Sequence, residues 1–150
     1  MIQALSEKFA VPTDKIATGT GSVGVFQQII QAVAGAGEEV IYAWRSFEAY
    51  PIITTIAGAV SVQVPLTNDG QHDLAAMQNA ITPKTRAIFV CTPNNPTGGI
   101  VTQHEINDFL AKVPKDVLVV IDEAYVEFNR DPLAIDGMAT MKAHSNVGVL

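Results

Sequence analysis

The chain has 150 residues, of which 48% are apolar and 16% charged, and its formal net charge is −6. This length and composition are typical of one globular domain and exclude a disordered or collagen-like chain. The balance of 9 basic against 15 acidic residues disfavours a nucleic-acid or anionic-membrane surface. The single cysteine, Cys91, cannot form an internal disulfide, and no apolar run approaches a membrane span. We therefore expect a soluble, cytoplasmic protein.

The first half of the chain alternates between helical and extended segments. Ser22 is a good N-cap, and apolar residues recur after it at three- and four-residue spacing, as on an amphipathic helix. Val60, Val62 and Val64 alternate with polar residues, which indicates a half-buried or edge strand. The elements predicted here are helices over 2–9, from 22 until Gly35, and over 50–57, and strands over 39–43 and 60–64.

The second half continues this alternation. Thr102 followed three residues later by Glu105 is a capping box, which marks the start of a helix. The predicted elements are helices over 73–80 and 102–111 and strands over 86–91, 117–121 and 146–150. Strands that alternate with helices in this way imply parallel βαβ crossovers. We predict an α/β fold, with residues 1–150 forming a single domain that is a three-layer α/β/α sandwich with a mostly parallel sheet.

Two carboxylates end the most apolar strand. Residues 117–121 are five consecutive aliphatic residues, typical of a strand buried on both faces. Asp122 follows directly, at the carboxyl edge where open α/β sheets bind ligands, and Tyr125 is close enough to face the same crevice. The alternative is that Asp122 and Glu123 only cap a loop.

A second polar loop, residues 92–99, follows the strand over 86–91. Its two prolines and two glycines restrict the backbone, so we expect the Asn95 amide to be held over the sheet edge, where it suits a small ligand oxygen. The alternative is a turn that uses asparagine only for its turn chemistry. The 27 positions from Asn95 to Asp122 accommodate one crossover helix. We therefore expect Asn95, Asp122 and Tyr125 to converge.

The segment N-N-P-T-G at Asn94–Gly98, followed after a helix by D-E-A-Y at Asp122–Tyr125, resembles the fold-type I pyridoxal-phosphate (PLP) aminotransferases. Within them it is most similar to the histidinol-phosphate and aromatic amino acid branch, and the resemblance extends over essentially the whole chain. It implies most of a large PLP-binding domain, truncated, with PLP as cofactor. It also implies amino acid and 2-oxo acid substrates and a homodimer for the complete protein.

The resemblance assigns four residues to the cofactor ring. Asp122 would lie against the pyridine nitrogen and keep it protonated, which makes the ring a better electron sink. Asn95 and Tyr125 would hydrogen-bond the phenolic oxygen of the ring. Phe47 would stack on the ring, for which a flat apolar face suffices, although it could also be an ordinary core aromatic.

The turn at Gly21, Ser22 and Val23 matches the phosphate loop of the family. Free backbone N–H groups at a helix start favour an anion, and Ser22 and Val23 would donate main-chain hydrogen bonds.

The same turn also fits a dinucleotide fingerprint, with Gly19, Gly21 and Gly24 at its three glycine positions. That fingerprint expects a strong preceding strand and an acidic residue at the end of the next strand. The preceding strand is weak here, and Glu38 and Glu39 open the next strand. A nicotinamide dehydrogenase is therefore the weaker interpretation.

The resemblance places several family features outside residues 1–150. The lysine that forms the Schiff base with PLP is expected beyond Leu150, so no catalytic residue is assigned within the chain. Lys142 lacks the Ser-Lys context of that residue. The amino-terminal segment, which supplies a tyrosine to the neighbouring subunit, and the small domain with its carboxylate-binding arginine are also absent. We therefore expect that this piece alone does not turn over substrate.

The complete protein is predicted to transaminate an amino acid with a 2-oxo acid acceptor. The turn at 21–24 lacks the acidic residue of many histidinol-phosphate members, and residues 44–50 add aromatic surface, which favours an aromatic amino acid over histidinol phosphate. Two alternatives are a non-catalytic PLP-binding or regulatory domain and another fold-type I enzyme, such as a lyase or decarboxylase. His72, His104 and His144 lack metal-ligand spacing and are expected at the surface.

Overall fold

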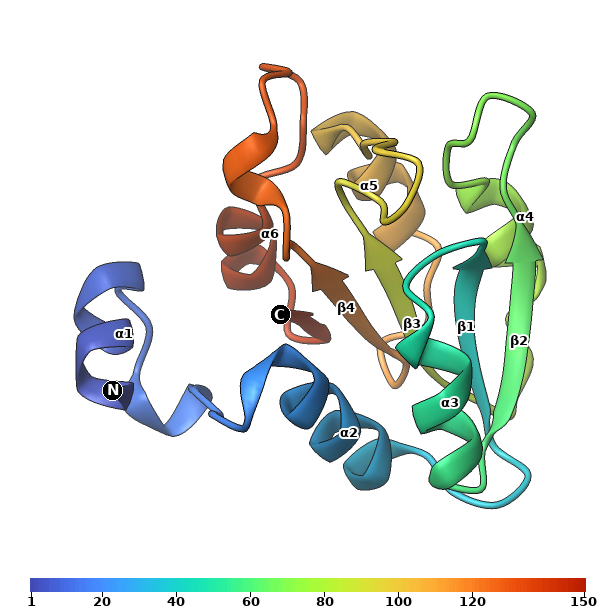
Figure 1. The fold of residues 1–150 in the computed structure, drawn as a ribbon, viewed down its shortest axis with the longest axis horizontal. Coiled ribbons are helices and arrows are strands. Elements are labelled where there is room, and N and C mark those ends of the chain that lie inside the picture. The colour runs from blue at the N-terminus through green and yellow to red at the C-terminus, as the bar shows by residue number, and fades with distance from the viewer.

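A parallel sheet of five strands crosses the middle of the molecule in the computed structural model, which describes residues 1–150 (Figure 1). The strands lie in the order β2-β1-β3-β4-β5, and every neighbouring pair is parallel. Their bounds are Glu39–Trp44 for β1, Val60–Pro65 for β2, Thr85–Cys91 for β3, Leu118–Asp122 for β4 and Val147–Val149 for β5. The predicted parallel sheet is confirmed.

Helices cover both faces of this sheet. The bounds are Ile2–Phe9 for α1, Gly21–Val33 for α2, Ala49–Ile56 for α3, Leu74–Asn79 for α4, Gln103–Leu110 for α5 and Gly137–Ala143 for α6, with single 3₁₀ turns at Thr13–Lys15 (η1) and Val126–Phe128 (η2). Side chains of α2 and α3 pack on one face, and those of α4, α5 and α6 pack on the other. Figure 1 shows α1 set apart from this body, and none of its residues is buried. Every helix is too short or too polar to cross a bilayer.

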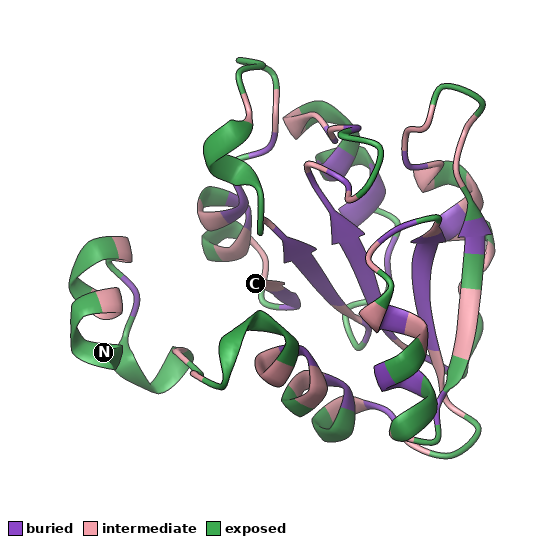
Figure 2. Ribbon diagram, in the orientation of Figure 1, coloured by how far each residue is buried: buried purple, intermediate pink, exposed green.

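The core is divided into two clusters, one on each face of the sheet. In β1, Ile41 and Ala43 pack toward α4 and α5, whereas Val40 and Tyr42 pack toward α2 and α3. Successive side chains of a strand point to opposite faces, so a strand covered on both faces must be apolar throughout. Figure 2 shows β1, β3 and β4 buried along most of their length, while β2 is largely exposed at the sheet edge, as predicted.

Local signals explain most helix boundaries. The Thr102 hydroxyl accepts a hydrogen bond from the Glu105 N–H, and the Glu105 carboxylate accepts one from the Thr102 N–H at 2.8 Å, which confirms the capping box. Helix α2 differs from the prediction, because it begins at Gly21 with Thr20 as its N-cap and has no side-chain capping bond. Helix α6 was not anticipated, although the Asp136 side chain caps its first turn.

The chain reverses its direction across the sheet between β1 and β3. After β1 it runs through α3 to the edge strand β2, whereas after β3 it runs through α5, on the opposite face, to β4. The loops that leave β1 and β3 therefore diverge at the carboxyl edge. This topological switch point is where open α/β sheets bind their ligands.

Candidate cofactor-binding site

Three loops meet at the carboxyl edge of the sheet, and backbone pairing fixes two of them together. Cys91 in β3 lies opposite Asp122 in β4, and the Thr92 N–H donates to the Asp122 carbonyl at 2.9 Å. The loop of residues 92–99 therefore leaves the sheet beside Asp122, as the sequence predicted. The loop after β1, which carries Phe47, completes the edge through the contacts described below.

Asp122 is a buried carboxylate at the end of β4, with 4% of its surface exposed. Its Oδ2 accepts a hydrogen bond from the Tyr50 hydroxyl at 2.5 Å, and its Oδ1 accepts one from the Ala124 N–H at 3.2 Å. Burial raises the pKa of the Asp122 carboxyl above its usual value, while these two hydrogen bonds act in the opposite direction. A carboxylate held in this way retains free lone pairs for a ligand at the sheet edge.

Glu123, the second carboxylate, has a different environment. Its Oε1 accepts a hydrogen bond from the Gly137 N–H at the start of α6, at 3.1 Å. Burial raises the pKa of Glu123, with that N–H acting against the shift. The loop-capping alternative therefore describes Glu123, whose carboxylate joins the loop after β4 to α6.

Asn94 and Asn95 have different surroundings. Asn94 is buried: its Oδ1 accepts from the Ser46 hydroxyl at 2.6 Å, and its Nδ2 donates to the Arg45 carbonyl at 3.2 Å and to Thr97 Oγ1 at 2.9 Å. The Asn95 side chain is half-buried and makes no hydrogen bond with another residue. The side-chain hydrogen bonds that anchor the loop are thus those of Asn94, and the orientation of the Asn95 amide over the sheet edge stays a prediction.

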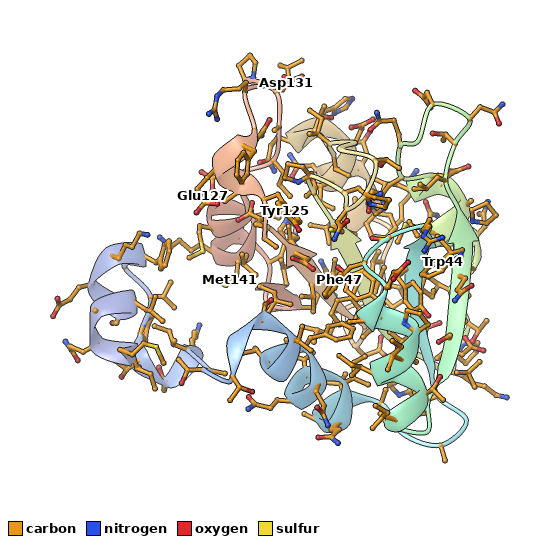
Figure 3. All side chains as sticks on the ribbon, viewed as in Figure 1. Trp44, Phe47, Tyr125, Glu127, Asp131 and Met141 are labelled. Atoms are coloured by element: carbon orange, nitrogen blue, oxygen red, sulfur yellow. The ribbon has the colours of Figure 1, made fainter.

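Two aromatic residues from different loops lie at this edge (Figure 3). Phe47 packs edge-on against Tyr50, with ring centroids 5.6 Å apart and an interplanar angle of 88°, and remains partly exposed. Tyr125 is 43% exposed, its ring lies 6.4 Å from that of Phe128, and its hydroxyl has no hydrogen-bond partner in the chain. Phe47 is therefore anchored to the core on one side, and the polar tip of Tyr125 is available to a ligand.

The glycine-rich turn forms the exposed amino end of α2. Gly21 has a φ of 74°, which favours glycine, and no side chain caps the N–H groups of the first turn. A Cβ on Gly24 would lie 2.8 Å from Thr20 Oγ1, so the turn is too tight for a larger residue there. Gly21, Ser22 and Val23 are all exposed, and their helix end is suited to an anion.

The dinucleotide interpretation lacks its structural context. Residues 16–19 belong to no strand of the sheet, whereas the fingerprint requires a strand directly before its first glycine. The spacing of Gly19, Gly21 and Gly24 alone does not define a nucleotide site.

His72 is the clearest error of the sequence interpretation outside this edge. It is buried, with 8% exposure, and its Nε2 lies 2.8 Å from the Cys91 carbonyl, so Nε2 carries the proton. Burial lowers the pKa of the ring. His104 is exposed, as predicted, and His144 is partly exposed. His72 lines two cavities near α4 and α5, of about 220 and 350 Å³, whose walls contain none of the predicted cofactor contacts.

The sequence analysis missed Tyr50, Ser46 and Asn94 as contributors to this edge. Tyr50 and Asp122 are separated by 72 positions, and Ser46 and Asn94 by 48. No local pattern reports such pairs. The available signal was the clustering of polar residues in the loops that directly follow strand ends.

A sequence model of the family described as aminotransferase class I and II matches residues 1–150, and the chain belongs to this PLP-dependent family. An aromatic amino acid aminotransferase from Streptomyces avermitilis is 62% identical over 150 residues, which are the whole of this chain and 42% of that protein. The chain thus spans about two-fifths of the length of this relative.

Solved structures share the fold. A histidinol-phosphate aminotransferase from Sinorhizobium meliloti, in complex with pyridoxal-5'-phosphate, superposes with a TM-score of 0.86 at 25% identity, over 97% of this chain and 40% of that one. An L-threonine-O-3-phosphate decarboxylase from Porphyromonas gingivalis gives 0.80 at 25% identity, over 99% and 42%. The α/β fold of PLP-dependent aminotransferases is therefore shown.

The residues at the carboxyl edge and at the start of α2 have the chemistry to bind PLP. A buried carboxylate with free lone pairs suits a protonated ring nitrogen, and an uncapped helix start suits a phosphate. Asn95 and Tyr125 both present polar groups that no other residue satisfies, and Phe47 presents part of an aromatic ring.

Proposed function

We propose that the complete protein catalyses PLP-dependent transamination between an amino acid and a 2-oxo acid, with an aromatic amino acid as the donor. The observation that carries this proposal is Asp122, a buried carboxylate at the end of β4 on the switch-point edge, where the loop that carries Asn95 also leaves the sheet. The identity of 62% with an aromatic amino acid aminotransferase supports the donor.

Seven residues of this chain would hold the cofactor. When bound, PLP supplies an electron sink for the substrate's α-carbon. Asp122 would hold the proton on the ring nitrogen, and its burial strengthens that interaction because little water screens it. The family resemblance assigns the others: Asn95 and Tyr125 would hydrogen-bond the ring oxygen, Phe47 would stack on the ring face, and Gly21, Ser22 and Val23 would bind the phosphate.

The remaining assignments rest on the family resemblance. The lysine that binds PLP covalently would follow residue 150 in the complete protein. We propose that the complete protein is cytoplasmic and works as a homodimer. Histidinol phosphate is the runner-up donor. A decarboxylase shares the scaffold, but no contact within this chain favours that reaction.

Steady-state kinetics of the complete protein test this proposal. We expect kcat/KM for phenylalanine or tyrosine with 2-oxoglutarate to exceed that for histidinol phosphate by about tenfold or more, which is the size of discrimination that pocket contacts supply. Asp122→Asn is the control for dependence on the site. A higher kcat/KM for histidinol phosphate would contradict the proposal that an aromatic amino acid is the donor. Release of carbon dioxide without amino transfer would contradict the proposal that the reaction is transamination. The 150-residue chain alone is expected to show no turnover.

A further inference from the structure

Tyr50 is the one side chain that hydrogen-bonds the Asp122 carboxylate. It is the second residue of α3, 1% exposed, and its hydroxyl lies 2.5 Å from Asp122 Oδ2. The pair joins the crossover after β1 to the end of β4, two elements that are not adjacent in the sheet. None of the expected cofactor roles includes Tyr50.

The proton of this pair lies on Tyr50. Burial raises the pKa of the Tyr50 phenol far above its usual range, and the charge of Asp122 raises it further. The phenol therefore stays neutral and donates, and the carboxylate accepts. A hydrogen bond to the ionised form of a carboxyl favours that form, so this donor opposes the effect of burial on Asp122.

The Tyr50 ring is fixed by other aromatic rings. Its centroid lies 4.9 Å from that of Phe26, 5.5 Å from that of Tyr42 and 5.4 Å from that of Phe89. Phe47 packs against it edge-on at 5.6 Å. Because the ring is held on several sides, the hydroxyl has little freedom to turn away. The Tyr50 hydroxyl therefore holds Asp122 Oδ2 in place through a hydrogen bond, and the Tyr50 ring holds the Phe47 ring in place through packing.

We propose that Tyr50 is the positioning residue of the cofactor site, which keeps Asp122 ionised and oriented toward the ring nitrogen of PLP and sets Phe47 beside the same ring. This inference rests on the proposed function, because it assigns Asp122 to the ring nitrogen. Tyr50 acts through Asp122 and Phe47 and does not itself contact the cofactor.

The test compares Tyr50→Phe with Tyr42→Phe in the 150-residue chain. Both changes remove one hydroxyl from the same aromatic cluster, but the Tyr42 hydroxyl only accepts a 3.5 Å hydrogen bond from Gln63 and makes none with Asp122. Carboxyl ¹³C NMR of the cofactor-free proteins, with Asp122→Asn to assign its signal, reports the Asp122 pKa directly. We expect this pKa to rise in Tyr50→Phe and to stay unchanged in Tyr42→Phe.

A PLP titration across pH gives the second measurement. PLP affinity should fall as the pH drops through the pKa of Asp122, because a protonated carboxyl cannot pair with the protonated ring nitrogen. In Tyr50→Phe the loss of PLP affinity should begin at a higher pH than in the unaltered chain. Near pH 7 the PLP affinity of Tyr50→Phe should be about tenfold weaker, which is the size expected for a lost hydrogen bond to a charged group. Tyr42→Phe should match the unaltered chain, and a purely structural role would weaken binding equally at all pH values.

The outcomes separate the two proposals. An unchanged Asp122 pKa in Tyr50→Phe, or an unshifted acid limb, would overturn the role of Tyr50 and leave the proposed function intact. If the unaltered chain binds no PLP, the role of Tyr50 toward PLP is overturned for this chain, and the kinetics of the complete protein then decide the proposed function separately.

Discussion

Replacing Asp122 by alanine is expected to lower the affinity of the chain for PLP by about 100-fold to 1,000-fold, the usual cost of leaving one partner of a buried charge pair alone. The carboxylate is 4% exposed and would be the anion facing the ring nitrogen. Because the site is buried, water cannot take the place of the lost carboxylate beside the ring nitrogen. Absorbance and fluorescence titrations at neutral pH measure the effect.

Two controls define the cause of this loss. Asp116 is exposed just before the amino end of the same strand, so Asp116→Ala removes the same charge at the opposite edge of the sheet and should bind PLP normally. Asp122→Asn keeps the shape but not the charge, and should lose affinity like Asp122→Ala. Binding by Asp122→Ala within about threefold of the unaltered chain would show that the charge does not hold the cofactor.

The second large effect is expected for Asn94→Ala, which should lower the free energy of unfolding by about 2–4 kcal/mol, because a buried amide that makes several hydrogen bonds is lost and its partners stay buried. Asn94 contacts Ser46, Arg45 and Thr97, and the Thr97 hydroxyl donates to the Gly70 carbonyl at 2.8 Å. It therefore joins the loops that follow β1, β2 and β3.

Urea unfolding of Asn94→Ala measures this effect, with Asn68→Ala as the matched control. Asn68 is exposed in the turn after β2, makes no side-chain hydrogen bond and should change stability by no more than about 0.5 kcal/mol. PLP affinity should also fall in Asn94→Ala, because Asn95 and Phe47 lie directly after the residues that this amide connects. Equal stability of the two variants would mean that Asn94 does not hold the loops together.

Much of the fold follows from short-range patterns. The run at 117–121 can be buried only in a central strand, and the spacing of Thr102 and Glu105 specifies a helix start by contacts within one turn. Parallel pairing then follows from the alternation of strands and helices. Asp122 reaches the sheet edge for the same reason, since it ends a strand whose direction the crossovers determine.

The details of the site depend on contacts between distant segments. Asn94 and Asn95 are identical in type and adjacent in sequence, and only the position of the loop after β1 decides that Asn94 is buried and Asn95 is available. Tyr50 appears as one more apolar-facing aromatic until α3 is placed against Asp122. His72 follows a polar turn, and its burial accompanies a hydrogen bond to the Cys91 carbonyl, 19 positions away.

The most direct test of the account is to map amide chemical shifts of the ¹⁵N-labelled 150-residue chain as PLP is added. We expect saturable shifts confined to the three loops at the carboxyl edge, residues 45–50, 92–99 and 122–126, and to the glycine-rich turn at residues 19–24, and their loss in Asp122→Ala. Shifts centred instead on His72, Leu74 and Glu105, which line both cavities near α4 and α5, would place the ligand elsewhere and contradict the account.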